Sequence, residues 1–322
     1  MKRKNNFLAL LIATLMISTL MFAGCSQTAK PTASKSAKII HITFVAPLVA
    51  NPYWDTVEAG AKAAGKDLNV NVQYVGSTAL DMNEWMKYIE TAISEKVDGI
   101  CTMALNEAAI KPLIDKAKAA NIPVTLVDTD APTSGRASYA GTDNTAAGKA
   151  LGEALAKLTN GKANIGLVTG ALDQPNLNLR IAGFKEGIKD FPNMKIVAFG
   201  GDNSDLQQCI QQGETMLKAH PEITTLVGVE GYGVPGLGRV VTESKNVGKI
   251  TVAGFDDQPD TLAFLKDGTA QISIVQRQYK MGYMGVSLLK DIIDGKKVDS
   301  IVDTGTVVLT KDNVSTYVPA SK

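Results

Sequence analysis

The chain has 322 residues, about the length of two domains, with hydrophobic residues at 45% and charged residues at 20%. This composition is typical of a globular protein with a large core, and it excludes a disordered or collagen-like chain. The 33 Lys and Arg residues offset 32 Asp and Glu residues, so no basic surface for nucleic acid is indicated. Three Cys residues are too few for a disulfide scaffold or a four-ligand zinc site, and two His residues leave little for metal or triad chemistry.

The first residues have the features of an export signal. A basic start over 2–4 precedes an uncharged apolar run over 7–22, which is short for a membrane-spanning helix but fits a signal peptide. The run ends in the letters FAGC, which resemble a lipobox whose Cys is lipidated. We expect a signal peptide at 1–24, then a lipidated Cys25 that opens a flexible tether over 25–37. An uncleaved anchor helix or an ordinary signal peptide is the alternative.

From residue 38 onward, short apolar runs alternate with amphipathic segments. Several runs have no polar interruption, as expected for strands buried on both faces of a parallel sheet. One intervening segment carries a helical stripe of Met82, Trp85, Met86, Ile89 and Ile93. Repeated strand–helix units predict an α/β fold with two doubly wound parallel sheets, one in each of two lobes. The predicted strands are 39–46, 70–76, 99–104, 122–128, 163–170, 195–200, 224–229, 250–256 and 270–275.

The residues that follow these strands are candidates for a binding site, because ligands of open α/β sheets lie beyond the carboxyl ends of the strands. Carboxylates, amides and two aromatic side chains gather there, with few cations. Carboxylates accept hydrogen bonds from hydroxyl groups, amides donate and accept, and aromatic rings cover apolar sugar faces, so the set suits a neutral polyhydroxyl ligand. It comprises 51–54, 128–130, 141–144, 173–178, Glu230, 256–257 and Gln276.

Seven motifs occur in order within residues 39–310: NPYW, VTLVDTDAP, GTDNTAAG, QPNLNLRIAGF, KAHPEI, VAGFDDQPD and VQRQYKMG. Together they resemble the type I periplasmic binding proteins of the ribose/galactose-binding kind, which are solute receptors of carbohydrate ABC transporters. The resemblance implies two lobes that close on a ligand, joined by three hinge strands with crossings near 141–143, 276–277 and 304–306. It assigns 38–142 plus 277–305 to lobe 1 and 143–276 plus 306–322 to lobe 2.

The resemblance also implies which residues contact the ligand. Asn51 matches a polar sugar contact, and Gln276 matches a contact beside a hinge. Tyr53 and Trp54 match two stacking aromatics. Two carboxylates that bind hydroxyl groups, one in each lobe, are matched by Asp128 and Asp256.

Four positions depart from the ribose-binding pattern. Thr129 and Asn178 stand where Arg is expected, and Ser204 stands where a third aromatic is expected. Glu230 replaces an Asn. Together these changes make the pocket more acidic and argue against ribose itself as the ligand. The predicted set of ligand-binding residues is completed by Asp130, Asn178, Arg180 and Glu230.

Each of these residues has a structural alternative. Asn51 could cap a helix whose first turn contains Pro52, and Asp128 and Asp256 could cap the helices that follow them. Tyr53 and Trp54 could pack under the loop instead of stacking on a sugar. Asp143 and Asn144 are interpreted as a cap and hinge element. The side chains expected to be packed without a ligand role are Trp85, Cys101, Cys209 and His41.

A glycine motif offers a different function. Residues 231–236 match G-x-G-x-x-G after a predicted strand, and Asp256 follows Gly236 by twenty residues, as in a dinucleotide fingerprint. The rival function is an exported NAD-dependent oxidoreductase. The export signal and the carboxylate of Glu230, which would repel a pyrophosphate, argue against it.

The sequence thus predicts a lipid-anchored, extracytoplasmic receptor that captures a sugar or sugar-like polyol and delivers it to an ABC transporter permease. It is expected to be a monomer without catalysis, cofactor, metal or nucleic-acid partner. A sensor that presents the ligand to a membrane signalling protein is the alternative. Pentose, hexose, inositol and amino sugar all remain open as ligands.

Overall fold

The structure, a computed structural model, describes residues 39–318. The predicted signal peptide, the lipidation site at Cys25 and the tether as far as residue 37 lie outside this part of the chain. Within it, no helix combines the length and the apolar character needed to cross a membrane. Two sheets of six strands each organise the described residues.

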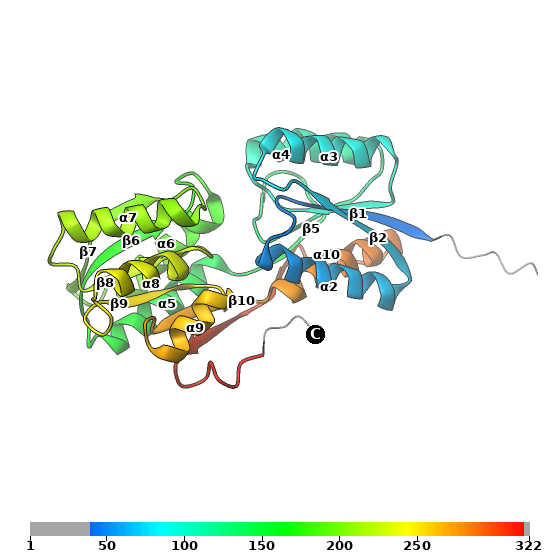
Figure 1. Cartoon of the computed structure of the whole chain (residues 1–322). Helices are drawn as coiled ribbons and strands as arrows, with labels where there is room; N and C mark the ends of the chain where they lie inside the picture. Colours follow the sequence, from blue (N-terminus) through cyan, green and yellow to red (C-terminus); the bar gives the residue numbers. More distant parts are fainter. Residues whose placement is uncertain (1–38, 319–322) are drawn as a thin grey trace, which may run out of the picture. The chain divides into compact units, whose positions relative to one another are not determined.

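The first sheet is entirely parallel, with the strand order β11-β5-β4-β3-β1-β2. Helices α3 (Met82–Ser94) and α4 (Glu107–Ala119) cover one face, and α2 (Pro52–Leu68) and α10 (Gln278–Ile293) cover the other (Figure 1). Its strands are β1 (Ile40–Ala46), β2 (Val70–Gly76), β3 (Gly99–Thr102), β4 (Val124–Val127), β5 (Ser138–Gly141) and β11 (Ile301–Asp303).

The second sheet has the order β12-β10-β9-β8-β6-β7, in which only β12 is antiparallel to its neighbour. Its strands are β6 (Lys162–Thr169), β7 (Asn193–Gly201), β8 (Thr225–Gly228), β9 (Thr251–Phe255), β10 (Ile272–Gln276) and β12 (Thr306–Thr310). Its helices are α5 (Asn144–Leu158), α6 (Pro175–Ile188), α7 (Leu206–Ala219), α8 (Gly233–Glu243) and α9 (Pro259–Asp267).

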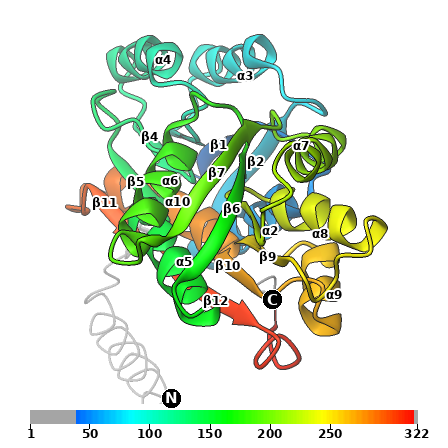
Figure 2. The same cartoon turned by 90° about the vertical axis from the view of Figure 1, so that its left-hand side faces the viewer.

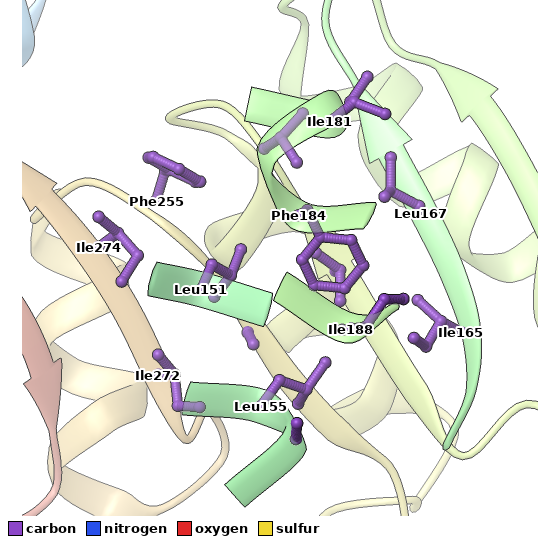
Figure 3. Close-up of a cluster of buried hydrophobic side chains, with 14 of the residues drawn as sticks. Leu151, Leu155, Ile165, Leu167, Ile181, Phe184, Ile188, Phe255, Ile272 and Ile274 are labelled. Carbon is purple, nitrogen blue, oxygen red and sulfur yellow. The ribbon is translucent and has the colours of Figure 1, made fainter. Parts of the chain in front are cut away.

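Both faces of the second sheet carry a hydrophobic core. Figure 2 shows α5 and α6 on one side of the strands and α7, α8 and α9 on the other. Figure 3 shows the first of these cores, where Leu151 and Leu155 of α5 and Phe184 of α6 pack toward strand residues such as Ile165 and Ile274. The predominance of apolar residues in the central strands follows from this burial on both faces.

The two sheets repeat one topology. Counted within each sheet, the first five strands follow the order 2-1-3-4-5, which is a doubly wound arrangement. The chain passes between the sheets between β5 and α5, between β10 and α10, and between β11 and β12. The predicted α/β fold with two doubly wound sheets is therefore confirmed, whereas the residue boundaries of the two lobes stay a prediction.

All nine apolar runs predicted as strands form strands. Trp85 is fully buried, and Cys101 and Cys209 are buried and free, as expected. The expectation for His41 is wrong, because its side chain is exposed and its Nδ1 lies 2.9 Å from Nδ2 of Asn71 on the neighbouring strand. Met82 is also exposed, although it belongs to the predicted apolar stripe of α3.

Candidate functional site

A cavity of about 400 Å³ lies at the carboxyl ends of strands from both sheets. This volume is in the range of a small-molecule site. The first sheet contributes the loops after β1, β2, β3 and β4, and the second contributes the loops after β6, β7, β8 and β9 together with the end of β10. Eight of the ten predicted ligand-binding residues line it: Asn51, Tyr53, Trp54, Asp128, Arg180, Glu230, Asp256 and Gln276.

The start of α2 places two aromatic side chains at the cavity. Asn51 is the N-cap, and its Oδ1 accepts hydrogen bonds from the backbone N–H groups of Tyr53 at 3.0 Å and Trp54 at 3.4 Å. The helix-cap interpretation of Asn51 is therefore confirmed, and it is compatible with a place in the cavity wall. The Tyr53 and Trp54 rings meet edge to face with centroids 5.4 Å apart, and Trp54 also packs in the core at 7% exposure.

Asp128 and Asp256 occupy equivalent places at the ends of β4 and β9. Both have left-handed backbone conformations, with φ of 62° and 67°. Neither is a helix cap, because Gln258 is the N-cap of α9 and the first helix after Asp128 is capped by Asp143. The capping alternative for the two carboxylates is thus wrong. Non-glycine residues at positive φ cost about 1–3 kcal/mol and concentrate at functional sites.

Both carboxylates are held by neighbouring donors. Tyr53 donates its hydroxyl hydrogen to Asp128 Oδ2 at 2.6 Å, and Thr129 donates to Asp128 Oδ1 at 2.7 Å. Gln276 Nε2 donates to Asp256 Oδ1 at 2.9 Å. A carboxylate oxygen accepts more than one hydrogen bond, so both groups can still receive hydroxyl groups from a ligand.

Arg180 is the only cation among the described residues that line the cavity. It is 2% exposed, its Nε donates to Asn144 Oδ1 at 2.8 Å, and its Nη1 donates to the Val229 carbonyl oxygen at 3.0 Å. Its guanidinium also lies 4.3 Å from the centroid of the Phe255 ring. These contacts fix the charge between two loops of the second sheet, and they give Asn144 a positioning role beside the cavity.

Burial dominates the electrostatics of the cavity. It raises the pKa of Asp256 to about 6, although Arg180 and the hydrogen bond from Gln276 act in the opposite direction. It also raises the pKa of Tyr53 well above its usual value, and the nearby carboxylates of Asp128 and Asp256 add to the effect. Tyr53 is therefore a neutral hydrogen-bond donor at physiological pH.

Glu230 differs from the acidic residue that the sequence indicated. Burial, followed by the charge of Asp202, raises the pKa of Glu230 well above its usual value. Asn51 and Tyr232 both line the cavity, Asn51 from the loop after β1 and Tyr232 from the loop after β8. Residues from both sheets thus form its wall.

Asp130 and Asn178 are the two predicted ligand-binding residues that do not line the cavity. Asp130 forms a bidentate ion pair with Arg136, with 2.6 Å between Oδ2 and Nη2, and Arg136 also donates to the Ser300 carbonyl oxygen at 2.7 Å. Asn178 donates to the carbonyl oxygen of Leu172 at 3.1 Å. The cavity geometry supports no ligand contact for either residue.

Several lining residues were not among the predicted contacts. Tyr232 belongs to the glycine motif, and Asp173, Gln174 and Asn176 were noted only as part of a polar segment after a strand. Apolar side chains also line the cavity, and the polar pattern gave no signal for them: Leu48, Leu80, Met82, Met103 and Leu105. The described residues contain no group of three or more His, Cys, Asp or Glu side chains arranged to hold a metal ion.

The glycines of the G-x-G-x-x-G motif have a packing explanation. A Cβ atom on Gly233 would lie 2.5 Å from the Cα of Gly228, and one on Gly236 would lie 2.6 Å from Cys209 Sγ. A Cβ on Gly231 would lie 2.7 Å from Nε2 of Gln258. The motif lets α8 pack closely against β8 and α7, so it needs no dinucleotide to account for it.

Comparison with known proteins gives the same picture. A family model described as a periplasmic binding protein domain matches residues 42–297. The glucose-galactose binding protein GanP of Geobacillus stearothermophilus is 36% identical, with a TM-score of 0.84 over 86% of this chain and 99% of its own. An ABC transporter solute-binding protein of Burkholderia graminis, solved with D-arabinose, is 36% identical, with a TM-score of 0.84 over 88% and 99%.

A curated relative extends the comparison beyond solved structures. The xylose/arabinose-binding protein XylF of Sulfolobus acidocaldarius is 26% identical over 298 residues, which are 87% of this chain and 73% of that protein. The family and these relatives are binding proteins rather than enzymes. The chain therefore belongs to the type I periplasmic binding protein family.

Proposed function

We propose that this protein captures a sugar or sugar-like polyol in the cavity and delivers it to an ABC transporter permease. The observation that carries the proposal is the composition of the cavity wall. Carboxylates, amides and aromatic rings come together from the strand ends of both sheets. Relatives that bind glucose and galactose, D-arabinose, and xylose or arabinose support a carbohydrate ligand.

The ligand contacts are divided between the sheets. Asp128 and the two aromatics at the start of α2 bind from the first sheet, whereas Asp256 and Arg180 bind from the second. Asn51, Glu230 and Gln276 complete the proposed set. Only a closed form makes both groups of contacts, so the ligand stabilises closure and the permease recognises the closed protein.

The export signal supports an extracytoplasmic location. We place the mature protein on the outer face of the cell membrane or in a periplasm, held by a lipid on Cys25. In this arrangement the binding protein is a monomer that meets its permease at the same membrane. Residues 25–37 serve as the tether between lipid and binding protein.

A ligand screen on the protein without its signal peptide tests the proposal. Thermal unfolding is measured with D-glucose, D-galactose, D-arabinose, D-xylose, inositol, D-glucosamine and NAD, because a ligand at 100 times its Kd stabilises by about 2.7 kcal/mol. A Trp85→Phe protein retains Trp54 in the cavity wall, so its emission should change with the same ligand. Stabilisation by NAD with none by any sugar or polyol would overturn the proposal.

A further inference from the structure

A pair of buried carboxyl groups lies where the second sheet meets the cavity. Glu230 follows β8 and lines the cavity at 7% exposure, whereas Asp202 follows β7, is fully buried and is not part of the described lining. β7 and β8 flank β6 on opposite sides. The Asp202 N–H donates to the Thr169 carbonyl oxygen of β6 at 2.8 Å. The Val229 N–H donates to the Val168 carbonyl oxygen at 3.0 Å, so the loops after β7 and β8 both begin beside the end of β6.

The two carboxyl groups act on each other electrostatically, since the charge of Asp202 is the largest cause after burial of the raised pKa of Glu230. A carboxylate has no hydrogen to donate, so a hydrogen bond between the two groups requires that one member of the pair is protonated. Glu230 Oε1 and Asp202 Oδ2 are both buried and have no donor from any other described group. Two ionised carboxylates at this depth would repel each other strongly, and one shared proton removes the repulsion.

The surrounding donors decide which group holds the proton. Ser204 donates its backbone N–H to Asp202 Oδ1 at 2.9 Å, so the ionised form of Asp202 is stabilised. No described group donates a hydrogen bond to Glu230 Oε1. Burial raises the pKa of both acids, and the charge of Asp202 raises that of Glu230 further, so we place the proton on Glu230.

The other charged groups do not reverse this assignment. Arg180 on α6 places Nη1 3.0 Å from the carbonyl oxygen of Val229, the residue before Glu230. Carboxyl groups nevertheless outnumber this single cation, so a second ionised carboxyl at the wall is disfavoured. The remaining titratable groups that face the pair from neighbouring elements are Asp205, Cys209, Tyr232 and Asp256.

We propose that Glu230 is a neutral carboxylic acid that contacts the ligand, with its proton shared with the ionised Asp202 behind the cavity wall. Asp202 is then a specificity-determining residue that does not touch the ligand. It keeps a negative charge off this part of the wall, and the site favours an uncharged hydroxyl over an ammonium group at this position. This substrate preference rests on the proposed sugar-binding function, whereas the shared proton does not.

Infrared spectroscopy of the ligand-free protein tests the proton itself. At pH 7.5 the wild-type protein should show the carbonyl stretch of a protonated carboxylic acid, shifted in D₂O. Glu230→Gln should abolish this band, because the amide takes the place of the protonated acid and Asp202 stays ionised. A wild-type spectrum without the band, or a band that persists in Glu230→Gln, would falsify the shared proton whether or not any sugar binds.

Affinity measurements test the role of Glu230 toward the ligand. The probe is whichever of D-glucose, D-galactose and D-arabinose the wild-type protein binds, measured by calorimetry at pH 7.5. Glu230→Gln mimics the neutral acid and should retain affinity within about threefold, whereas Glu230→Leu should lose about tenfold or more with the hydrogen bond. Asp256→Asn is the matched control for an ionised carboxylate and should lose about tenfold to a hundredfold.

The pattern across the variants separates the possibilities. A Glu230→Gln loss as large as that of Asp256→Asn would mean that Glu230 binds as a carboxylate. Unchanged affinity in both Glu230 variants would mean that Glu230 does not contact the ligand. Glu230→Gln should lower the affinities for D-glucosamine and for D-glucose by the same factor. A greater loss of affinity for D-glucosamine would contradict a neutral Glu230. Failure of every sugar to bind the wild type counts against the proposed function, and the infrared result then stands alone.

Discussion

At the residue scale, the cavity contains a buried carboxyl group, that of Asp256, whose ionised form is disfavoured by folding. Asp256 is 3% exposed and has a left-handed backbone conformation, and burial raises its pKa to about 6. Its one side-chain hydrogen bond in the described structure comes from Gln276. Hydroxyl groups of a ligand would supply the missing donors, so the ionised form is stabilised by binding rather than by folding.

Asp256→Asn is therefore expected to affect stability and affinity in opposite directions. The folded protein binds more protons than the unfolded chain between the ordinary Asp pKa of 3.8 and about 6, so wild-type stability falls as pH rises through this window. At pH 7.5 the ligand-free Asn variant should be more stable by up to about 3 kcal/mol, with no difference near pH 3.5. Urea unfolding at both pH values measures this effect.

The affinity of the same variant for a sugar should be lower than that of the wild type, although its stability is higher. Wild-type affinity for a sugar should rise with pH up to about 6 and then level off, since the ionised carboxylate accepts the stronger hydrogen bonds. The Asn variant should bind about tenfold to a hundredfold more weakly, without this rise. Calorimetric titration from pH 5 to pH 8 tests it, and a wild-type affinity that is flat over this range would rule out Asp256 as a hydroxyl acceptor.

Much of the site could be predicted from residues alone, because carboxyl ends of parallel strands meet at one edge of a sheet. Asp128, Glu230 and Asp256 follow strands directly and all reach the cavity. Asp130 and Asn178 could not be separated from them, because their partners, Arg136 and the Leu172 carbonyl oxygen, become neighbours only in the folded protein. The apolar residues that line the cavity could not be predicted either, because their pattern in the sequence does not differ from that of core residues.

At the element scale, a close helix pair recurs beside each sheet. A Cβ atom on Gly60 of α2 would lie 2.0 Å from the Tyr279 carbonyl oxygen of α10. In the second sheet, a Cβ on Gly183 of α6 would lie 2.0 Å from the Thr145 carbonyl oxygen of α5. The backbones of each pair thus touch, and no side chain fits between them. Arg180 lies on α6 one turn before Gly183, so this packing also positions a cavity residue.

Helix packing and helix propensity predict opposite signs for the change in stability caused by Gly183→Ala. Propensity alone favours Ala in a helix interior by about 1 kcal/mol. The contact with α5 leads us to expect the opposite, a loss of about 1–3 kcal/mol from overpacking. Urea unfolding should therefore show a lower midpoint, with weaker sugar binding where α6 has shifted. The neighbouring exposed Ala182→Gly is the control, and it should follow propensity alone.

The predictability of the strands followed the composition of each segment and, at the sheet edges, its burial. The nine strands found in the sequence include every one whose apolar run is flanked by clear helical segments. The three that were missed are short or mixed in character. β5 contains Ser and Gly, β11 has three half-buried or exposed residues, and β12 is a mostly half-buried edge strand. Their pairing depends on contacts with distant strands, which periodicity within the segment does not encode.

At the scale of the whole molecule, the segments that pass between the sheets are linked to the cavity. Thr142, just after β5, donates to Gln276 Oε1 at 3.0 Å, and Gln276 donates in turn to Asp256 at 2.9 Å. Lys280 at the start of α10 donates to the Thr304 carbonyl oxygen at 3.3 Å, between β11 and β12. In the proposed function, a ligand that binds Asp256 therefore acts on residues at two of the connections, which would link binding to closure.

Membrane attachment is the last property expected of the whole molecule, and it depends on Cys25. The FAGC letters predict that lipid is added to this Cys and that cleavage before it makes Cys25 the first mature residue. Cells expressing the wild-type chain and fed a fatty-acid analogue should yield labelled protein in the membrane fraction. Cys25→Ser should lose the label and the membrane association. Cys101→Ala is the matched control, because its thiol is buried and out of reach of the modification. Equal labelling of the Cys25→Ser and wild-type proteins would show that Cys25 does not carry the lipid.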